Sequence, residues 1–121
     1  MIYYLTYNKI GVCMNSTIVN FLDNIPTSSK EEIFQTITQN KNIKIERIIS
    51  YGQTTPKEYW YDQSEDEFVL ILEGEAKIRY DDKSIYHLKK GDNLYIKANQ
   101  KHQVTYTSNP TIWLAIFITK N

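Results

Sequence analysis

The sequence is poor in residues from which many functional sites are built. It contains one cysteine, Cys13, and two histidines among 121 residues. A single cysteine excludes an internal disulfide and fits a reducing compartment. No apolar run approaches the roughly 20 residues that span a bilayer, and the N-terminus is a poor signal peptide because polar residues interrupt it. We therefore expect a cytoplasmic protein without a membrane partner.

Net charge is also absent. Lys and Arg number 14, and so do Asp and Glu, which gives a formal net charge of zero. Proteins that bind nucleic acids through bulk charge need a positive excess, so we expect no nucleic-acid partner. Aromatic residues, by contrast, are frequent at 13%, and ten of them are Tyr. Tyr joins an apolar ring to a polar tip, which suits strands, pocket walls and interfaces.

The length of the chain allows one domain with one continuous core. We expect an N-terminal extension over residues 1–25 and a single domain over residues 26–121. Near the start of this domain, Ser28 or Ser29 is followed three residues later by a Glu, which is the spacing of a capping box. Apolar residues then recur at helical spacing, which predicts one short helix over about residues 28–40.

The remainder of the chain, over about residues 43–119, reads as a series of short strands. Segments that are apolar or alternating in polarity are separated by turn residues such as Asp81-Asp82-Lys83. Such regular spacing favours a sandwich or barrel over βαβ units. The expected strands are Ile43–Ser50, Phe68–Leu72, Glu75–Tyr80, Ser84–Leu88, Leu94–Ile96, Gln103–Thr107 and Ile112–Ile118.

Two of these strands, Phe68–Leu72 and Ile112–Ile118, are apolar on both faces. A barrel strand turns one face inward and one outward, so something must cover the outer face. The helix, the N-terminal segment and a second subunit are the candidates. Leaving several large apolar side chains in water is unfavourable, at about 25 cal/mol per Å². We expect a homodimer.

Two segments carry residues suited to chemistry. In the first, Glu67 begins an apolar strand that ends at Gly74; in the second, Gly91 precedes a strand and is followed by His102. The apolar residues after Glu67 place its carboxylate toward the interior. A buried carboxylate needs a partner, which a metal ion, an imidazole such as that of His102, a Tyr hydroxyl or water could supply.

These segments resemble the two motifs of the cupin family, which are small antiparallel β-barrels of jelly-roll type with an internal pocket. The resemblance covers roughly residues 43–118 and extends to small single-domain bacterial cupins of unknown function. The family's two histidines ahead of the Glu fall on Tyr61 and Gln63 with one spacing, or on Trp60 and Asp62 with another. In the second motif, the family's Pro, Gly and Asn are replaced by Lys97, Asn99 and Tyr106.

The resemblance also implies a metal site. A metal-binding cupin uses three His and one Glu, a ligand set that suits Fe, Mn, Ni or Zn. This sequence keeps only Glu67 and His102 in register, because His87 lies outside the motif positions. Asp62 or Gln63 could add an oxygen ligand. The sequence therefore leaves open the weak binding of one divalent ion, with Glu67, His102, Asp62 and Gln63 as ligands.

Three functions follow as hypotheses. The first is binding of a small polar ligand in a pocket lined by Tyr61, Gln63, Glu67, His102 and Tyr106. The second is catalysis by Glu67 and His102, in a metal-dependent oxygenase or a metal-free isomerase. The third is a non-catalytic barrel that acts through protein interaction. A polar pair that only fixes the barrel interior is the alternative to any active role.

Overall fold

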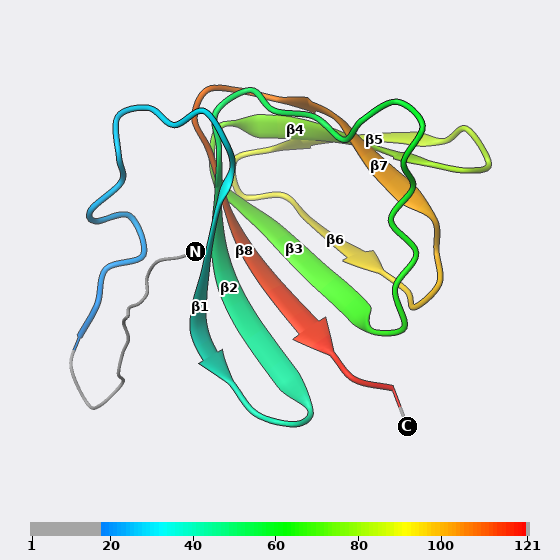
Figure 1. The fold of residues 1–121 in the computed structure, drawn as a ribbon, viewed down its shortest axis with the longest axis horizontal. Coiled ribbons are helices and arrows are strands. Elements are labelled where there is room, and N and C mark those ends of the chain that lie inside the picture. Colours follow the sequence, from blue (N-terminus) through cyan, green and yellow to red (C-terminus); the bar gives the residue numbers. More distant parts are fainter. Residues whose placement is uncertain (1–17, 121) are drawn as a thin grey trace.

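A computed structural model describes residues 18–120, and within this range the chain forms eight β-strands in two sheets (Figure 1). The two sheets pack against each other, as expected for the predicted all-β barrel. The strands are β1 (Ile33–Gln39), β2 (Ile43–Ser50), β3 (Asp66–Glu73), β4 (Glu75–Tyr80), β5 (Ile85–Lys89), β6 (Asn93–Ile96), β7 (His102–Thr107) and β8 (Thr111–Ile118).

The larger sheet has the strand order β1-β2-β8-β3-β6, and the smaller one has the order β5-β4-β7. Neighbouring strands are antiparallel. Ile48 of β2 lies opposite Phe34 of β1 and Trp113 of β8, and Trp113 in turn lies opposite Ile71 of β3. Because side chains alternate between the faces of a sheet, this register defines one inner and one outer face.

The core lies between the inner faces of the two sheets. Ile71 of β3 and Ile78 of β4 come from different sheets, and both are fully buried. These apolar side chains exclude water from the centre of the barrel and hold the sheets together. The buried core cluster consists of Val69, Ile71, Ala76, Ile78, Tyr80, Leu88, Ile96, Trp113 and Ala115.

The helix that we predicted over residues 28–40 is wrong, because most of this segment is strand β1. Ser29 does not cap a helix: its hydroxyl contacts the backbone of Glu31 in a local turn. Ile and Thr dominate β1, and these β-branched residues favour strands. β1 pairs with the edge of β2. The spacing of apolar residues within β1 cannot reveal this partner. Among residues 18–120, no helix is long and apolar enough to cross a membrane.

Part of the outer face of the larger sheet is covered by the segment that precedes β1. Arg47 of β2 is buried there, and its guanidinium donates hydrogen bonds to the carbonyl oxygens of Phe21 and Asp23 and to the side chain of Gln35. Residues 21–23 are thereby fixed to the barrel. The first 17 residues of the expected extension lie outside the described part of the chain.

Two turns have left-handed backbone conformations that fit the motif residues. Gly74 joins β3 to β4 with a φ of 83°, and an added Cβ would lie only 2.5 Å from the carbonyl oxygen of Pro110. Asn99 replaces the glycine of the second motif and has a φ of 64°. Asn tolerates this conformation better than most residues, so the turn survives the replacement.

Candidate functional site

A partly open pocket of about 100 Å³ lies between the two sheets. Its apolar wall is built from inner-face residues of both sheets, and its polar groups lie on β2, β3 and β7 and on the segments that precede β1 and β3. The lining residues are Glu32, Phe34, Glu46, Ile48, Tyr61, Gln63, Glu67, Val69, Ile78, Ile96, His102, Val104, Trp113 and Phe117.

Glu67 and His102 meet in this pocket, as the resemblance implied. Glu67 lies near the start of β3 and His102 begins β7, so the two side chains come from different sheets. The Nε2 atom of His102 is 3.6 Å from Oε1 of Glu67, which is an ion-pair distance but long for a hydrogen bond. Both side chains are almost fully buried. The pair is therefore sheltered from water yet exposed to the pocket.

The hydrogen bond of the second ring nitrogen of His102, Nδ1, determines whether Nε2 carries a proton. Nδ1 lies 2.8 Å from the backbone carbonyl oxygen of Gln100, which can only accept a hydrogen bond. Nδ1 must therefore carry a proton, and Nε2 is protonated only in the imidazolium form. Burial lowers the pKa of His102, but the Glu67 side chain and the Gln100 carbonyl together raise it above its ordinary value. When neutral, His102 directs a basic Nε2 at the pocket.

Of the two pairs that could stand in for the family's two histidines, Tyr61 and Gln63 line the pocket, whereas Trp60 and Asp62 do not. The Tyr61 ring stacks on the imidazole of His102 with a centroid distance of 5.4 Å. The backbones of these two residues also exchange hydrogen bonds. The amide of Gln63 donates a 2.9 Å hydrogen bond to Oε1 of Glu67. Both residues thus support the pair rather than replace the missing imidazoles.

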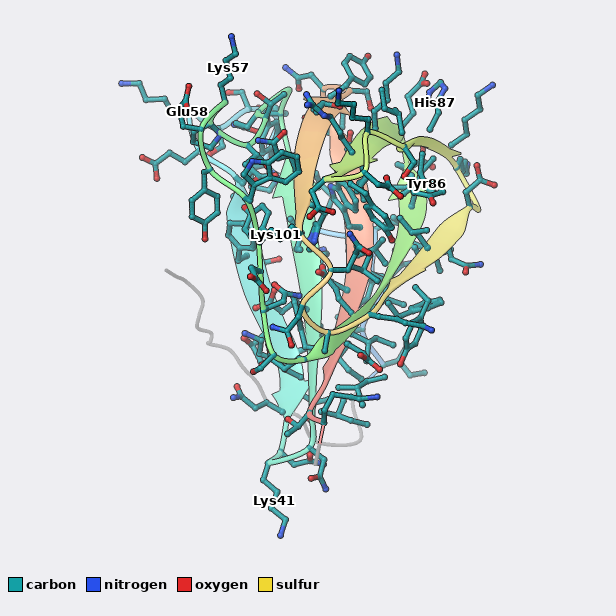
Figure 2. The ribbon with its side chains drawn as sticks, turned by 90° about the vertical axis from the view of Figure 1, so that its right-hand side faces the viewer. Lys41, Lys57, Glu58, Tyr86, His87 and Lys101 are labelled. Carbon is teal, nitrogen blue, oxygen red and sulfur yellow. The ribbon has the colours of Figure 1, made fainter. Side chains whose placement is uncertain are left out.

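The structure does not bring the other predicted site residues to the pocket. Asp62 is exposed and accepts a hydrogen bond from the side chain of Asn99. Tyr106 is also exposed, beside the ammonium group of Lys77. His87 pairs with Glu75 across β5 and β4 and lies at the outer edge of the molecule (Figure 2).

The donor set does not fit a resident metal. Structural and catalytic zinc sites use at least three protein ligands, whereas His102 and Glu67 place only one imidazole and one carboxylate side by side. The Gln63 side chain turns its NH₂ group toward Glu67, and an NH₂ group is no metal ligand. Within residues 18–120, no group of three His, Cys, Asp or Glu side chains is placed to hold an ion.

Two carboxylates in the pocket were missed by the sequence analysis. Glu32 was assigned to a helix cap, but it precedes β1 and contacts the hydroxyl of Ser50. Glu46 lies on the inner face of β2 and forms a 3.2 Å ion pair with Lys44. Lys44, Glu46 and Ile48 lie two residues apart, so the sequence indicates that they share one face of the strand. It does not show whether this face points inward.

Comparisons with known proteins agree with this architecture. Residues 47–117 match a family model described as "Cupin domain". The crystal structure of a "putative mannose-6-phosphate isomerase" from Ralstonia eutropha has a TM-score of 0.82 and 36% identity, and the match covers 86% of this chain and 99% of that chain.

Other similar structures show the fold alone. A conserved protein of unknown function from Streptococcus pyogenes has a TM-score of 0.74 at 17% identity, over 90% of this chain and 92% of that chain. A cupin superfamily protein from Desulfitobacterium hafniense has a TM-score of 0.69 at 21% identity, over 79% and 84%. No curated protein matches this chain.

Proposed function

This chain belongs to the cupin family, and we propose that it binds a small organic molecule in the pocket between its two sheets. The observation that carries the proposal is the pair formed by Glu67 and His102, which is buried yet borders the pocket. Small-molecule sites typically combine apolar walls with a few convergent polar groups. Here the walls are aromatic and aliphatic, and the polar groups are carboxylates, an imidazole, an amide and a phenol.

The pocket argues against a phosphorylated sugar, although the similar Ralstonia eutropha protein is described as a "putative mannose-6-phosphate isomerase". Phosphate sites are built from Arg or Lys side chains or from clustered backbone N–H groups. Among the described residues that line the pocket there is no Arg or Lys, and three Glu side chains are present. These carboxylates would repel a phosphate group.

A second candidate function is a metal-free isomerisation. His102 directs Nε2 at the pocket, and Glu67 lies beside it to hold the imidazolium that forms. In such a reaction on a hydroxycarbonyl compound, Nε2 removes the proton from the carbon that bears the hydroxyl, and the carbonyl oxygen takes up a proton to give an enediol. The carbon-bound proton, or one from solvent, then returns to the former carbonyl carbon while the original hydroxyl loses its proton and becomes the new carbonyl. The general base must lie within hydrogen-bond reach of the reacting proton, and His102 lines the pocket in which a substrate would lie.

A fragment screen by NMR tests the binding proposal. Small polar fragments are added to ¹⁵N-labelled protein, and we expect some of them to shift the indole N–H of Trp113 and the backbone N–H signals of pocket residues. Trp60, which does not line the pocket, is the internal control. Val104→Trp fills the pocket and should remove the response. Shifts that persist in this variant, or no pocket response to any fragment, would overturn the proposal.

The isomerase candidate needs a separate test. Small hydroxycarbonyl compounds are incubated with the protein in D₂O, and deuterium at the carbon next to the carbonyl is measured by mass spectrometry. His102→Gln and Glu67→Gln should each reduce the exchange about 100-fold or more. Exchange equal to that of buffer alone would leave a binding protein without this catalysis.

The proposal includes a cytoplasmic location and a homodimer. The single cysteine, Cys13, fits a reducing compartment and supports the location. The apolar outer face of the larger sheet supports the dimer. Ile45, Ile116 and Phe68 lie in one row across β2, β8 and β3 on the face opposite the pocket, and each remains partly accessible.

A further inference from the structure

The charges in the pocket are not evenly matched. Three carboxylates, those of Glu32, Glu46 and Glu67, line it. Glu46 has an ammonium partner in Lys44 at 3.2 Å, and Glu67 has the imidazole of His102 at 3.6 Å. In residues 18–120, no Lys, Arg or His forms an ion pair with Glu32. Within the described part of the chain, Glu32 is thus the pocket carboxylate without an ion pair.

Glu32 is nevertheless held in a fixed position. Its Oε2 atom accepts a hydrogen bond from the hydroxyl of Ser50, which is fully buried. The Ser50 oxygen in turn accepts a 3.0 Å hydrogen bond from the indole N–H of Trp113. These two linked hydrogen bonds occupy only Oε2 of the Glu32 carboxylate. In the described part of the protein the other oxygen, Oε1, has no hydrogen-bond partner, which leaves it available to a ligand.

The walls around this carboxylate are apolar and aromatic. Phe34 follows Glu32 by two residues on the same face of the chain, and it lies opposite Ile48, which pairs with Trp113. Tyr61, on the segment before β3, also lines the pocket. Aromatic faces attract cations, and apolar walls exclude water and strengthen the attraction. A ligand that carries a positive charge on a short apolar chain would satisfy both features.

The electrostatics of the pocket point the same way. Burial raises the pKa of Glu32, and the hydrogen bond from Ser50 only partly opposes this. Burial, followed by the negative charge of Glu32, also raises the pKa of the Tyr61 hydroxyl. The charged carboxylate is therefore less stable than it would be in water, and a bound cation would relieve this cost.

We propose that the pocket selects a small organic cation of the alkylammonium class, whose charge lies against the carboxylate of Glu32. This inference rests on the proposed function, because it names the class of molecule that the same pocket binds. The ammonium group donates a hydrogen bond to Oε1 of Glu32, and its alkyl chain packs against Ile48 and Trp113. A pocket of about 100 Å³ holds only a few heavy atoms, since a cavity of about 150 Å³ is filled by benzene.

The test compares three probes of matched size: n-butylammonium, 1-butanol and butyrate. Each is titrated at constant ionic strength into ¹⁵N-labelled protein, and the indole N–H of Trp113 reports binding. We expect n-butylammonium to bind at least about tenfold more tightly than either of the others, as for a charge-assisted hydrogen bond. Glu32→Gln keeps the acceptor for Ser50 but removes the charge, and it should abolish this preference.

The matched control is Glu31→Gln, which removes an exposed charge one residue away and should leave the preference intact. If 1-butanol or butyrate binds as tightly as n-butylammonium, the cation inference is overturned while binding in the pocket stands. If a folded Glu32→Gln variant keeps the tenfold preference, Glu32 is not the selecting group. If none of the three probes shifts Trp113, the inference fails, and the fragment screen decides separately whether the pocket binds anything.

Discussion

The imidazole of His102 and the carboxylate of Glu67 approach to 3.6 Å although 35 positions in the sequence and two different sheets separate them. Gln63 holds the carboxylate and the Gln100 carbonyl holds the imidazole, so neither group needs the other to be fixed in place. The pair is sheltered from bulk water and borders a pocket. These features make it the polar centre on which the proposed binding depends.

The pair predicts how stability depends on pH. The folded protein raises the pKa of His102 above about 6.5, so it holds the proton more tightly than the unfolded chain does. The stabilisation is therefore complete below about pH 6.5 and is lost as the pH rises through the raised pKa. We expect the difference in free energy of unfolding between wild type and His102→Gln, measured in urea, to shrink over this range. A difference that does not change with pH would contradict the pairing.

The turn at Gly74 predicts a large cost for a single methyl group. In Gly74→Ala the new Cβ would lie 2.3 Å from Oγ of Ser108 and 2.5 Å from the carbonyl oxygen of Pro110. Backbone strain and this clash together should cost about 3 kcal/mol or more of unfolding free energy. Gly52→Ala is the control, because Gly52 also has a positive φ, of 90°, but an added Cβ would meet no atom within 4 Å among the described residues. It should cost only about 1–2 kcal/mol, and equal losses would show that the close approach at Gly74 is absent.

The buried guanidinium of Arg47 predicts a role in holding the N-terminal segment. Arg47→Met leaves the carbonyl oxygens of Phe21 and Asp23 without their donor, which should cost about 2–4 kcal/mol in urea unfolding. Cleavage by a protease near residues 21–24 should become faster. Arg79→Met is the control, since among residues 18–120 its side chain loses only a contact with the ring of Trp60, worth about 1 kcal/mol. Similar cleavage rates in both variants would argue against the anchor.

The proposed homodimer predicts a particle of twice the chain mass by light scattering at micromolar concentration. Ile116→Lys places a charge at the centre of the apolar row on the outer face and should give a folded monomer. Lys77→Glu, an exposed change on the smaller sheet, should leave the dimer unchanged. A monomeric wild type would show that this face needs no second copy.

Most of the barrel could be predicted from the sequence because its strands are short, apolar or alternating, and separated by turn residues. The segment at Ile33, Phe34 and Ile37 could not, because its spacing is compatible with both a helix and a strand. Its structure is decided by pairing with β2, which is a tertiary contact. Local pattern therefore fails where a neighbouring strand supplies the decisive interaction.

Part of the candidate site could be predicted from the sequence. Glu67 and His102 were found because they stand in motif register, and Tyr61 and Gln63 because they fill the places of missing histidines. Glu32 was missed because it belongs to the segment whose structure was predicted wrongly. Tyr106 was expected in the pocket, but its strand turns it outward.

The most direct test of the account is the pKa of His102, measured by NMR of its imidazole signals in the wild type and in Glu67→Gln. Burial alone lowers this pKa, and the Glu67 side chain is the main group that raises it. We predict a wild-type value above about 6.5 and a clearly lower value in the variant. Equal values in the two proteins would contradict the claim that these two groups form the polar centre of the pocket.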